Sequence, residues 1–288
     1  RSLKESLIAN KISKIYGIFN GTSNYILSSM DKQNKNFQEV LSIAKKLGYA
    51  ESNPTSDLNG DDVSSKLKIL SSLCFNSFLS DNIYVEGIKD IDSVDINNAN
   101  NLGYKIKLLG FAELLNNNIY QRVHPTLIKK NSYVAGIDGV LNAVIIDGKP
   151  VGQSIIQGEG AGPAATTSAL ISDISSILRG NVKFPFSVSG KERKKLKFNS
   201  IDERLFSAYF RFEVIDKPGV LSIITSVFSK NKVSIKRLVQ NPKKNKKISS
   251  IIIITHKSKD KFLNMILKEI AKKSFVKKKP KLIRIDDN

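Results

Sequence analysis

The residues whose types and spacing could do chemistry gather just after the first fifty positions. Asp62 and Lys66 are four apart in a stretch with helical periodicity, so they share one face of a helix. Glu51 and Asp57 lie in the polar segment that leads into that helix. A carboxylate beside an ammonium could grip a zwitterionic substrate, and a lysine can donate a proton when its pKa is tuned. The same spacing fits an N-capped helix with an ordinary surface ion pair, so spacing alone leaves both interpretations open.

A second candidate is the glycine-rich segment 158–163, which reads Gly-Glu-Gly-Ala-Gly-Pro. Glycines let a ligand approach the backbone, and the free N–H groups of a following helix suit an anion or a carboxamide. The segment is not a dinucleotide fingerprint, because Pro163 stands where G-x-G-x-x-G has its last glycine. A tight packing turn explains the segment equally well.

The elements that must position these residues can be read from apolar spacing and turn residues. Asn20 and its neighbours are expected to cap a helix, and Gly48 to stop the next one. Helices are predicted over 22–30, 37–47, 61–76, 100–115 and 163–179, the tail of a helix over 1–10, and strands over 12–19, 83–89, 119–126, 133–136 and 141–147.

The last third of the chain predicts a separate, regular alternation. Strands are expected over 206–215, 233–240, 248–255 and 281–285, with helices running to about 230 and over 259–273. That order is the ferredoxin-like βαββαβ plan. Pro185, Gly190 and a charged run interrupt the chain before it and predict a linker over 181–203. We therefore expect one domain over 1–180 and another over 204–288.

Composition sets limits on the class of protein. A length of 288 residues is typical of about two domains, and a hydrophobic content of 41% argues against a disordered chain. No apolar run approaches the roughly 18 residues that a membrane span needs, so no membrane is expected as a partner. One Cys and two His make a Cys/His metal cluster improbable and favour a reducing compartment, so we predict no metal site in this chain and a cytoplasmic location.

The net charge of +20 sits mainly in residues 191–288, which hold 27 basic and 9 acidic residues. Such an excess indicates either a polyanion-binding surface or solvated loops in a lysine-rich chain. Nucleic-acid sites usually combine basic residues with exposed aromatic side chains or with arginines, and the basic residues of this region are mostly Lys. We therefore expect no nucleic-acid partner.

Three motifs resemble those of the homoserine dehydrogenase family, in the family's order. They are residues 17–27 (Gly-Ile-Phe-Asn-Gly-Thr-Ser-Asn-Tyr-Ile-Leu), residues 47–66 (Leu-Gly-Tyr-Ala-Glu through Asp57, Gly60, Asp62 and Lys66) and residues 158–168. Residues 204–288, with Asp-Lys-Pro-Gly-Val-Leu at 216–221, look like an ACT domain, the arrangement of single-function enzymes and not of the aspartokinase fusions. The resemblance implies an α+β fold, with a catalytic domain for substrate binding and dimerisation followed by the ferredoxin-like ACT domain.

The resemblance also implies an activity and assigns roles. The family reduces L-aspartate 4-semialdehyde to L-homoserine with NADPH or NADH, on the route to threonine and methionine. Lys66 matches the general acid/base. Glu51 and Asp62 match substrate-binding carboxylates and Asp57 a nearby acid, while the cofactor-contacting glycines correspond to Gly48 and Gly162. A homo-oligomer is expected, with an amino-acid effector such as threonine at the ACT domain.

The chain departs from the family by lacking its amino-terminal Rossmann domain, which carries the pyrophosphate loop, a second lysine and most ligands of a sodium-type ion. Together with the start at Arg1, this predicts an inactive piece of the full enzyme. Ser52 and Asn53 stand before Pro54, where the family commonly has an acid.

Two hypotheses from other classes of protein compete with the enzyme hypothesis. The first is a non-catalytic amino-acid-sensing module, and the second is a basic nucleic-acid-binding protein whose binding would depend steeply on salt. A Rossmann segment in frame upstream of Arg1 would support the enzyme, and a stop codon there the sensing module.

Overall fold

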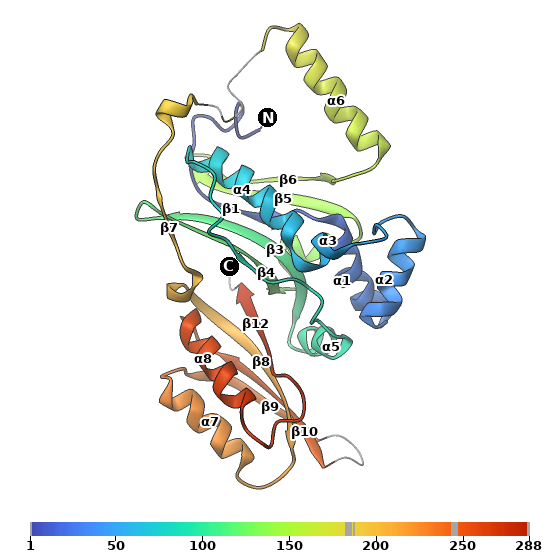
Figure 1. The fold of residues 1–288 in the computed structure, drawn as a ribbon, viewed down its shortest axis with the longest axis vertical. Coiled ribbons are helices and arrows are strands. Elements are labelled where there is room, and N and C mark those ends of the chain that lie inside the picture. Colours follow the sequence, from blue (N-terminus) through green and yellow to red (C-terminus); the bar gives the residue numbers. More distant parts are fainter. Residues whose placement is uncertain (1, 182–185, 187, 243–246, 287–288) are drawn as a thin grey trace. The chain divides into compact units, whose positions relative to one another are not determined.

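A computed structural model describes residues 2–181, 186, 188–242 and 247–286 (Figure 1). The chain divides into two compact units. Residues 1–100, 105–125 and 130–199 form unit 1, and residues 101–104, 126–129 and 200–288 form unit 2. The combination of helices and mainly antiparallel strands is the expected α+β class.

Unit 1 is built on an antiparallel sheet in which five strands follow the order β6-β5-β1-β3-β4. The strands are β1 (Lys11–Ile18), β3 (Tyr104–Leu115), β4 (Asn118–Lys129), β5 (Leu141–Lys149) and β6 (Gly152–Glu159), and short β2 (Tyr84–Val85) and β7 (Lys197–Asn199) pair with β4 in parallel. Asn116 and Asn117, both with positive φ, form the hairpin turn between β3 and β4. The centre of the sheet is apolar, with Ile15, Leu109 and Ile145 fully buried.

The helices of unit 1 are α1 (Gly21–Gln33), α2 (Phe37–Lys46), α3 (Thr55–Asn59), α4 (Asp61–Phe75), α5 (Ser93–Asn101) and α6 (Pro163–Leu178). Those that pack on the sheet bring the motif residues to one end of β1. α1 packs on α2 and β5, and α4 packs on β1. As expected, Asn20 caps α1, and Gly48 follows the end of α2 with φ of +75°. None of the residues of α6 is buried.

Several expected elements are wrong. Residues 100–115 do not form a helix but contain β3, because residues 106–112 are buried on both faces and a continuous apolar run carries no period. Residues 133–136 form a 3₁₀ turn and residues 2–9 form turns where a helix tail was expected. The short helix α3 and the exposed edge strand β6 were missed, since neither shows a clear apolar period.

The expected linker is only partly open to comparison, because residues 182–185 and 187 lie outside the described residues. The described residues after them hold short elements. They are η2 (Gly190–Glu192), β7 and η3 (Ile201–Glu203).

Unit 2 follows the expected βαββαβ order. Its elements are β8 (Leu205–Ile215), α7 (Val220–Lys230), β9 (Ile235–Pro242), β10 (Ile248–Thr255), α8 (Asp260–Ala271) and β12 (Lys281–Asp286), with short β11 (Ser258–Lys259) beside β8. The sheet order is β12-β8-β10-β9, and α7 packs against α8 (Figure 1). Phe210 and Phe212 of β8 meet Phe228 of α7, whose ring lies 5.2 Å from that of Phe210. These aromatic contacts join the helices to the sheet.

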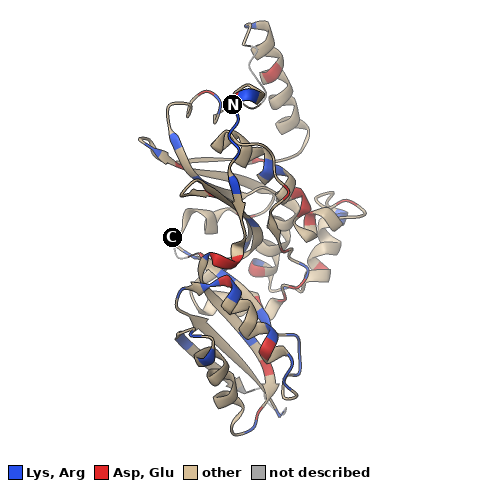
Figure 2. Ribbon diagram, turned by 60° about the vertical axis from the view of Figure 1, so that its left-hand side comes forward, with Lys and Arg blue, Asp and Glu red and all other residues tan. Residues whose placement is uncertain are grey.

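The basic residues of unit 2 include one buried arginine that forms an ion pair. Arg284 is buried and forms a two-pronged ion pair with buried Asp260, at 2.6 and 3.0 Å. Figure 2 shows Lys and Arg on several elements of this unit, with acidic residues between them. No helix within the described residues is both long and apolar enough to cross a membrane.

Candidate active site

A cavity of about 590 Å³ opens in unit 1 where the three sequence motifs meet. All six of the residues singled out in the sequence line it: Gly48, Glu51, Asp57, Asp62, Lys66 and Gly162. They come from the end of α2, from α3, from the first two turns of α4 and from the loop before α6. Spacing suggested that Asp62 and Lys66 share a face, but only the fold brings Gly162 to them.

The ion pair at the start of α4 forms as expected. Lys66 Nζ lies 2.8 Å from Asp62 Oδ2, and it also donates a hydrogen bond to the carbonyl of Phe19 at 2.9 Å. Gly60 makes this geometry possible, because its φ of +88° ends α3 and starts α4 within a single residue. The ammonium of Lys66 is thus held between a carboxylate and the end of β1.

Asn20 is a site residue that the sequence assigned only to capping. Its Nδ2 donates to Asp57 Oδ1 at 2.7 Å and to Asp62 Oδ2 at 2.9 Å, while its Oδ1 accepts from Ser23 N at 2.8 Å. One buried amide therefore caps α1 and ties together two carboxylates from different helices. Its place in the motif at 17–27, directly after β1, was the available signal.

Carboxylates dominate the wall of the cavity. Glu51 and Glu159 line it together with Asp57 and Asp62, against the single ammonium of Lys66. Glu51 is exposed, and within the part of the chain that the structure describes its side chain makes no hydrogen bond or ion pair. Because Asp62 is already paired with Lys66, the remaining charge favours a ligand that carries an ammonium group. Glu159 was not singled out from the sequence.

The loop after α2 is fixed to α1 by side-chain contacts. Thr22 Oγ1 donates to the carbonyl of Tyr49 at 2.7 Å, and the rings of Tyr25 and Tyr49 lie 4.9 Å apart. These contacts hold the loop that carries Gly48 and Glu51 against the start of α1.

The two glycines of the cavity leave room for a flat ligand. A Cβ added at Gly48 or at Gly162 would have no heavy atom within 4 Å, so a side chain at either position would occupy open space at the cavity wall. Gly162 also caps α6, and its φ of +106° is one that side-chain-bearing residues rarely adopt. Such surroundings let a ligand approach the backbone at both glycines. Among the described residues, no group of three His, Cys, Asp or Glu side chains could hold a metal ion.

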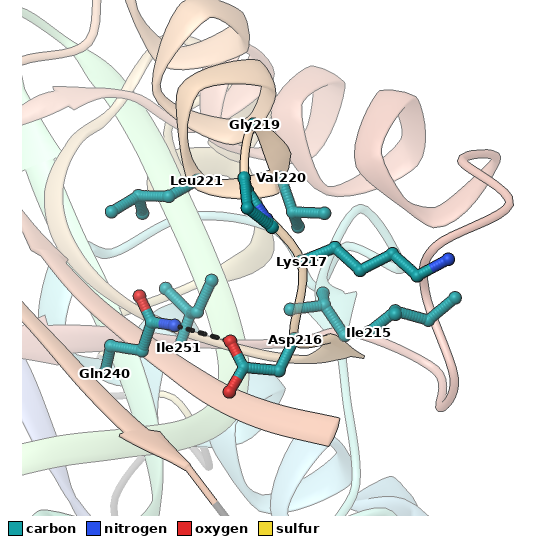
Figure 3. Close-up of a pocket in the computed structure, with 10 residues that line it drawn as sticks. Ile215, Asp216, Lys217, Gly219, Val220, Leu221, Gln240 and Ile251 are labelled. Carbon is teal, nitrogen blue, oxygen red and sulfur yellow. Dashed lines mark hydrogen bonds between the residues drawn. The ribbon is translucent and has the colours of Figure 1, made fainter. Parts of the chain in front are cut away.

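Unit 2 has a cavity of its own, of about 480 Å³, where β8 leads into α7 (Figure 3). Asp216 accepts a hydrogen bond from Gln240 Nε2 of β9 at 3.3 Å, and Ile251 and Leu221 supply apolar wall. Figure 3 shows Lys217 pointing away from Gln240. Gly219 precedes α7, whose first N–H groups lie at this cavity and suit a carboxylate.

Comparison with known proteins identifies both parts of the chain. Residues 1–175 match the homoserine dehydrogenase family model, and residues 210–277 match the AHAS small subunit-like ACT domain. A homoserine dehydrogenase of Neisseria gonorrhoeae is 37% identical over 293 residues, covering 99% of this chain and 67% of that protein.

Solved structures agree with these matches. A homoserine dehydrogenase from Thiobacillus denitrificans superimposes with a TM-score of 0.91 at 36% identity, over 99% of this chain and 67% of that one. A hyperthermophilic archaeal homoserine dehydrogenase mutant, described as a complex with NADPH, gives a TM-score of 0.52 at 26% identity, over 61% of this chain and 50% of that one.

Proposed function

The chain belongs to the homoserine dehydrogenase family of oxidoreductases, and from that premise we propose that its unit 1 cavity reduces L-aspartate 4-semialdehyde to L-homoserine with a nicotinamide cofactor. The observation that carries the proposal is the convergence of Asp57, Asp62 and Lys66 around Asn20. A surface ion pair would not need a buried amide to join it to a second carboxylate from another helix.

Each cavity residue has its own role in the proposed reaction. Glu51 and Asp62 bind the amino group of the aldehyde and the amino and hydroxyl groups of the product homoserine, and Asp57 adds to the negative field that attracts the ammonium. The nicotinamide, when bound, supplies the hydride that adds to the aldehyde carbon. Lys66 then donates a proton from Nζ to the oxygen that becomes the hydroxyl, and its charge stabilises the developing alkoxide.

We propose Gly48 and Gly162 as the contacts for the nicotinamide end of NADPH or NADH. The open space at both glycines supports this, and a related archaeal enzyme is described with NADPH. We propose that the pyrophosphate binds to the Rossmann domain that the family resemblance implies; this chain covers 67% of the Neisseria relative. Any sodium-type ion would belong with that domain, and no step of the reaction here depends on it.

The domain division proposed from the sequence assigns residues 1–180 to catalysis, 181–203 to a linker and 204–288 to regulation. For the last of these we propose an amino-acid effector such as threonine in the unit 2 cavity. The N-terminus of α7 would receive its carboxylate and Asp216 its ammonium. The edge strand β9 lies at this cavity, and its open edge supports pairing between copies of the chain. Homoserine formed by this enzyme would feed threonine and methionine synthesis in the cytoplasm.

Calorimetric titration of the chain with L-homoserine tests the proposed substrate site. We expect wild-type protein to bind homoserine and Glu51→Gln to bind it at least tenfold more weakly, since an unpaired carboxylate facing an ammonium is lost. Glu39→Gln is a matched control, because Glu39 belongs to the capping box of α2 and does not line the cavity. Equal affinities for all three proteins would contradict the assignment of the cavity.

A further inference from the structure

Lys107 is a buried cation outside the cavity that the proposed reaction does not use. Its side chain, on β3, is only 1% exposed. Nζ donates to Asn24 Oδ1 at 3.0 Å, to Asp138 Oδ1 at 2.8 Å and to the carbonyl of Ile137. Three acceptors match the three donors of an ammonium. Burial of a charge is costly unless the charge is paired and hydrogen-bonded, and the contacts of Lys107 meet that condition.

The acceptors of Lys107 join α1 to the chain segment 137–141. Asn24 of α1 donates from Nδ2 to the carbonyls of Ile137 and Leu141, both at 3.1 Å. Ser28, one turn further along α1, accepts from the N–H of Gly139 at 3.0 Å. Lys107 and Asn24 therefore share the carbonyl of Ile137 as a common partner, and the segment is held along one side of the helix.

Two connections link this hydrogen-bond network to the cavity of unit 1. Asn24 N donates to the carbonyl of Asn20 at 3.3 Å, and Asn20 is the residue that holds Asp57 and Asp62. The second route is the segment itself, which runs directly into Val140 and Asn142 of the cavity wall. A displacement of α1 would also move the end of β1, where Lys66 is hydrogen-bonded.

We propose that Lys107 is a positioning residue for the proposed dehydrogenase site: it locks segment 137–141 onto α1 and so fixes the orientation of Asn20. Only the expected effect on kcat rests on the proposed function; the structural link between Lys107 and α1 does not. Other charges face the same place. Asp138 also pairs with Lys32 at 3.0 Å and with Lys105 at 3.5 Å, and Lys105 lies 3.8 Å from Asp31.

The neighbouring charges do not duplicate Lys107. Asp138 keeps an ion pair when either of the other two lysines is removed, but within the described residues Lys107 alone of these three lysines donates to Asn24 and to the carbonyl of Ile137. Burial lowers the pKa of Lys107, opposed by Asp138.

The test compares Lys107→Met with Lys105→Met in the full-length enzyme that includes the cofactor-binding segment. Lys105→Met removes a neighbouring cation from Asp138 and from Asp31 of α1, but no hydrogen bond to α1 or to residue 137. With homoserine and cofactor saturating, and well below each melting temperature, we expect kcat per folded enzyme to fall about 10–100-fold in Lys107→Met and to stay nearly unchanged in Lys105→Met. A purely structural role would lower the melting temperature and leave kcat per folded enzyme normal, and that result would overturn the proposal.

Two further measurements keep the proposal testable if Lys107→Met does not fold or wild-type protein shows no turnover. Asn24→Ala keeps the pair of Lys107 and Asp138 but removes the hydrogen bonds that join Asn24 of α1 to Lys107, Ile137 and Leu141, so it should lose kcat in the same way. Ser28 and Lys32 still connect α1 to the segment in this variant. Hydrogen exchange on the 288-residue chain should show faster exchange at Gly139 N in Asn24→Ala than in Lys105→Met. Absent wild-type turnover would refute the proposed function alone, whereas unchanged protection of Gly139 would refute the positioning network.

Discussion

Replacement of Asn20 separates its helix cap from its contacts with the carboxylates. Asn20→Ser keeps a side-chain oxygen for Ser23 N, since serine is among the best N-cap residues, but a serine is too short to bridge Asp57 and Asp62. Asn20→Ala loses both functions. We therefore expect the alanine variant to be less stable than the serine variant by about 1 kcal/mol, the usual cost of a lost N-cap.

The catalytic effect should follow the two lost amide contacts. Each hydrogen bond to a charged acceptor contributes about 1.5–3 kcal/mol, and the partial exposure of Asp62 reduces this, so we expect a total near 2 kcal/mol. At about 1.4 kcal/mol per factor of ten, kcat/KM for homoserine should fall roughly 30-fold in both variants. Urea unfolding and steady-state kinetics of the full-length enzyme measure the two effects. Wild-type kcat/KM in Asn20→Ser would refute the view that Asn20 aligns the carboxylates.

Three other outcomes follow from the same structure. Asp62→Ala should raise KM because the substrate loses an anchor, whereas Asp61→Ala, outside the cavity, should not; equal KM values would remove Asp62 from the site. Lys259 and Lys261 hold the pKa of Glu203 at about 2 instead of 4.5, so its contribution to stability is present above about pH 4.5 and lost as pH falls toward 2. Urea unfolding across that range should show a smaller pH dependence in Glu203→Gln, and an unchanged one would contradict the pairing. Titration with threonine should show weaker binding in Asp216→Ala but not in Lys217→Ala, and equal affinities would exclude Asp216 as a ligand of the effector.

The sequence predicted unit 2 well because its helices are amphipathic and clear turns separate its strands, even though β8 and β10 are buried along most of their length. In unit 1 it failed where burial is two-sided. The run that includes Leu108, Leu109 and Phe111 forms β3, and only its pairing with β1 distinguishes it from a buried helix. The edge strand β6 was missed for the opposite reason, since residues on both of its faces are exposed and no alternation results.

The candidate site shows the same division between local and long-range information. The helical spacing of Asp62 and Lys66 was sufficient to predict their ion pair, which the structure contains at 2.8 Å. No local pattern could place the glycine loop at the same cavity, because it is nearly a hundred residues away along the chain. Asn20 and Lys107 were not recognised, since their proposed roles depend on partners 30 to 83 residues distant.

The most direct test of the central claim is the single-turnover rate of cofactor oxidation with L-aspartate 4-semialdehyde in Lys66→Ala. We predict a loss of about 10²–10⁴-fold, because the proton donor and the charge facing the alkoxide disappear together. Stability should fall by only about 1 kcal/mol, since a partly exposed i,i+4 ion pair and one hydrogen bond to the carbonyl of Phe19 are lost. Lys68→Ala, on the same helix and paired with Asp81, should react at the wild-type rate. A near-normal rate in Lys66→Ala would contradict the account.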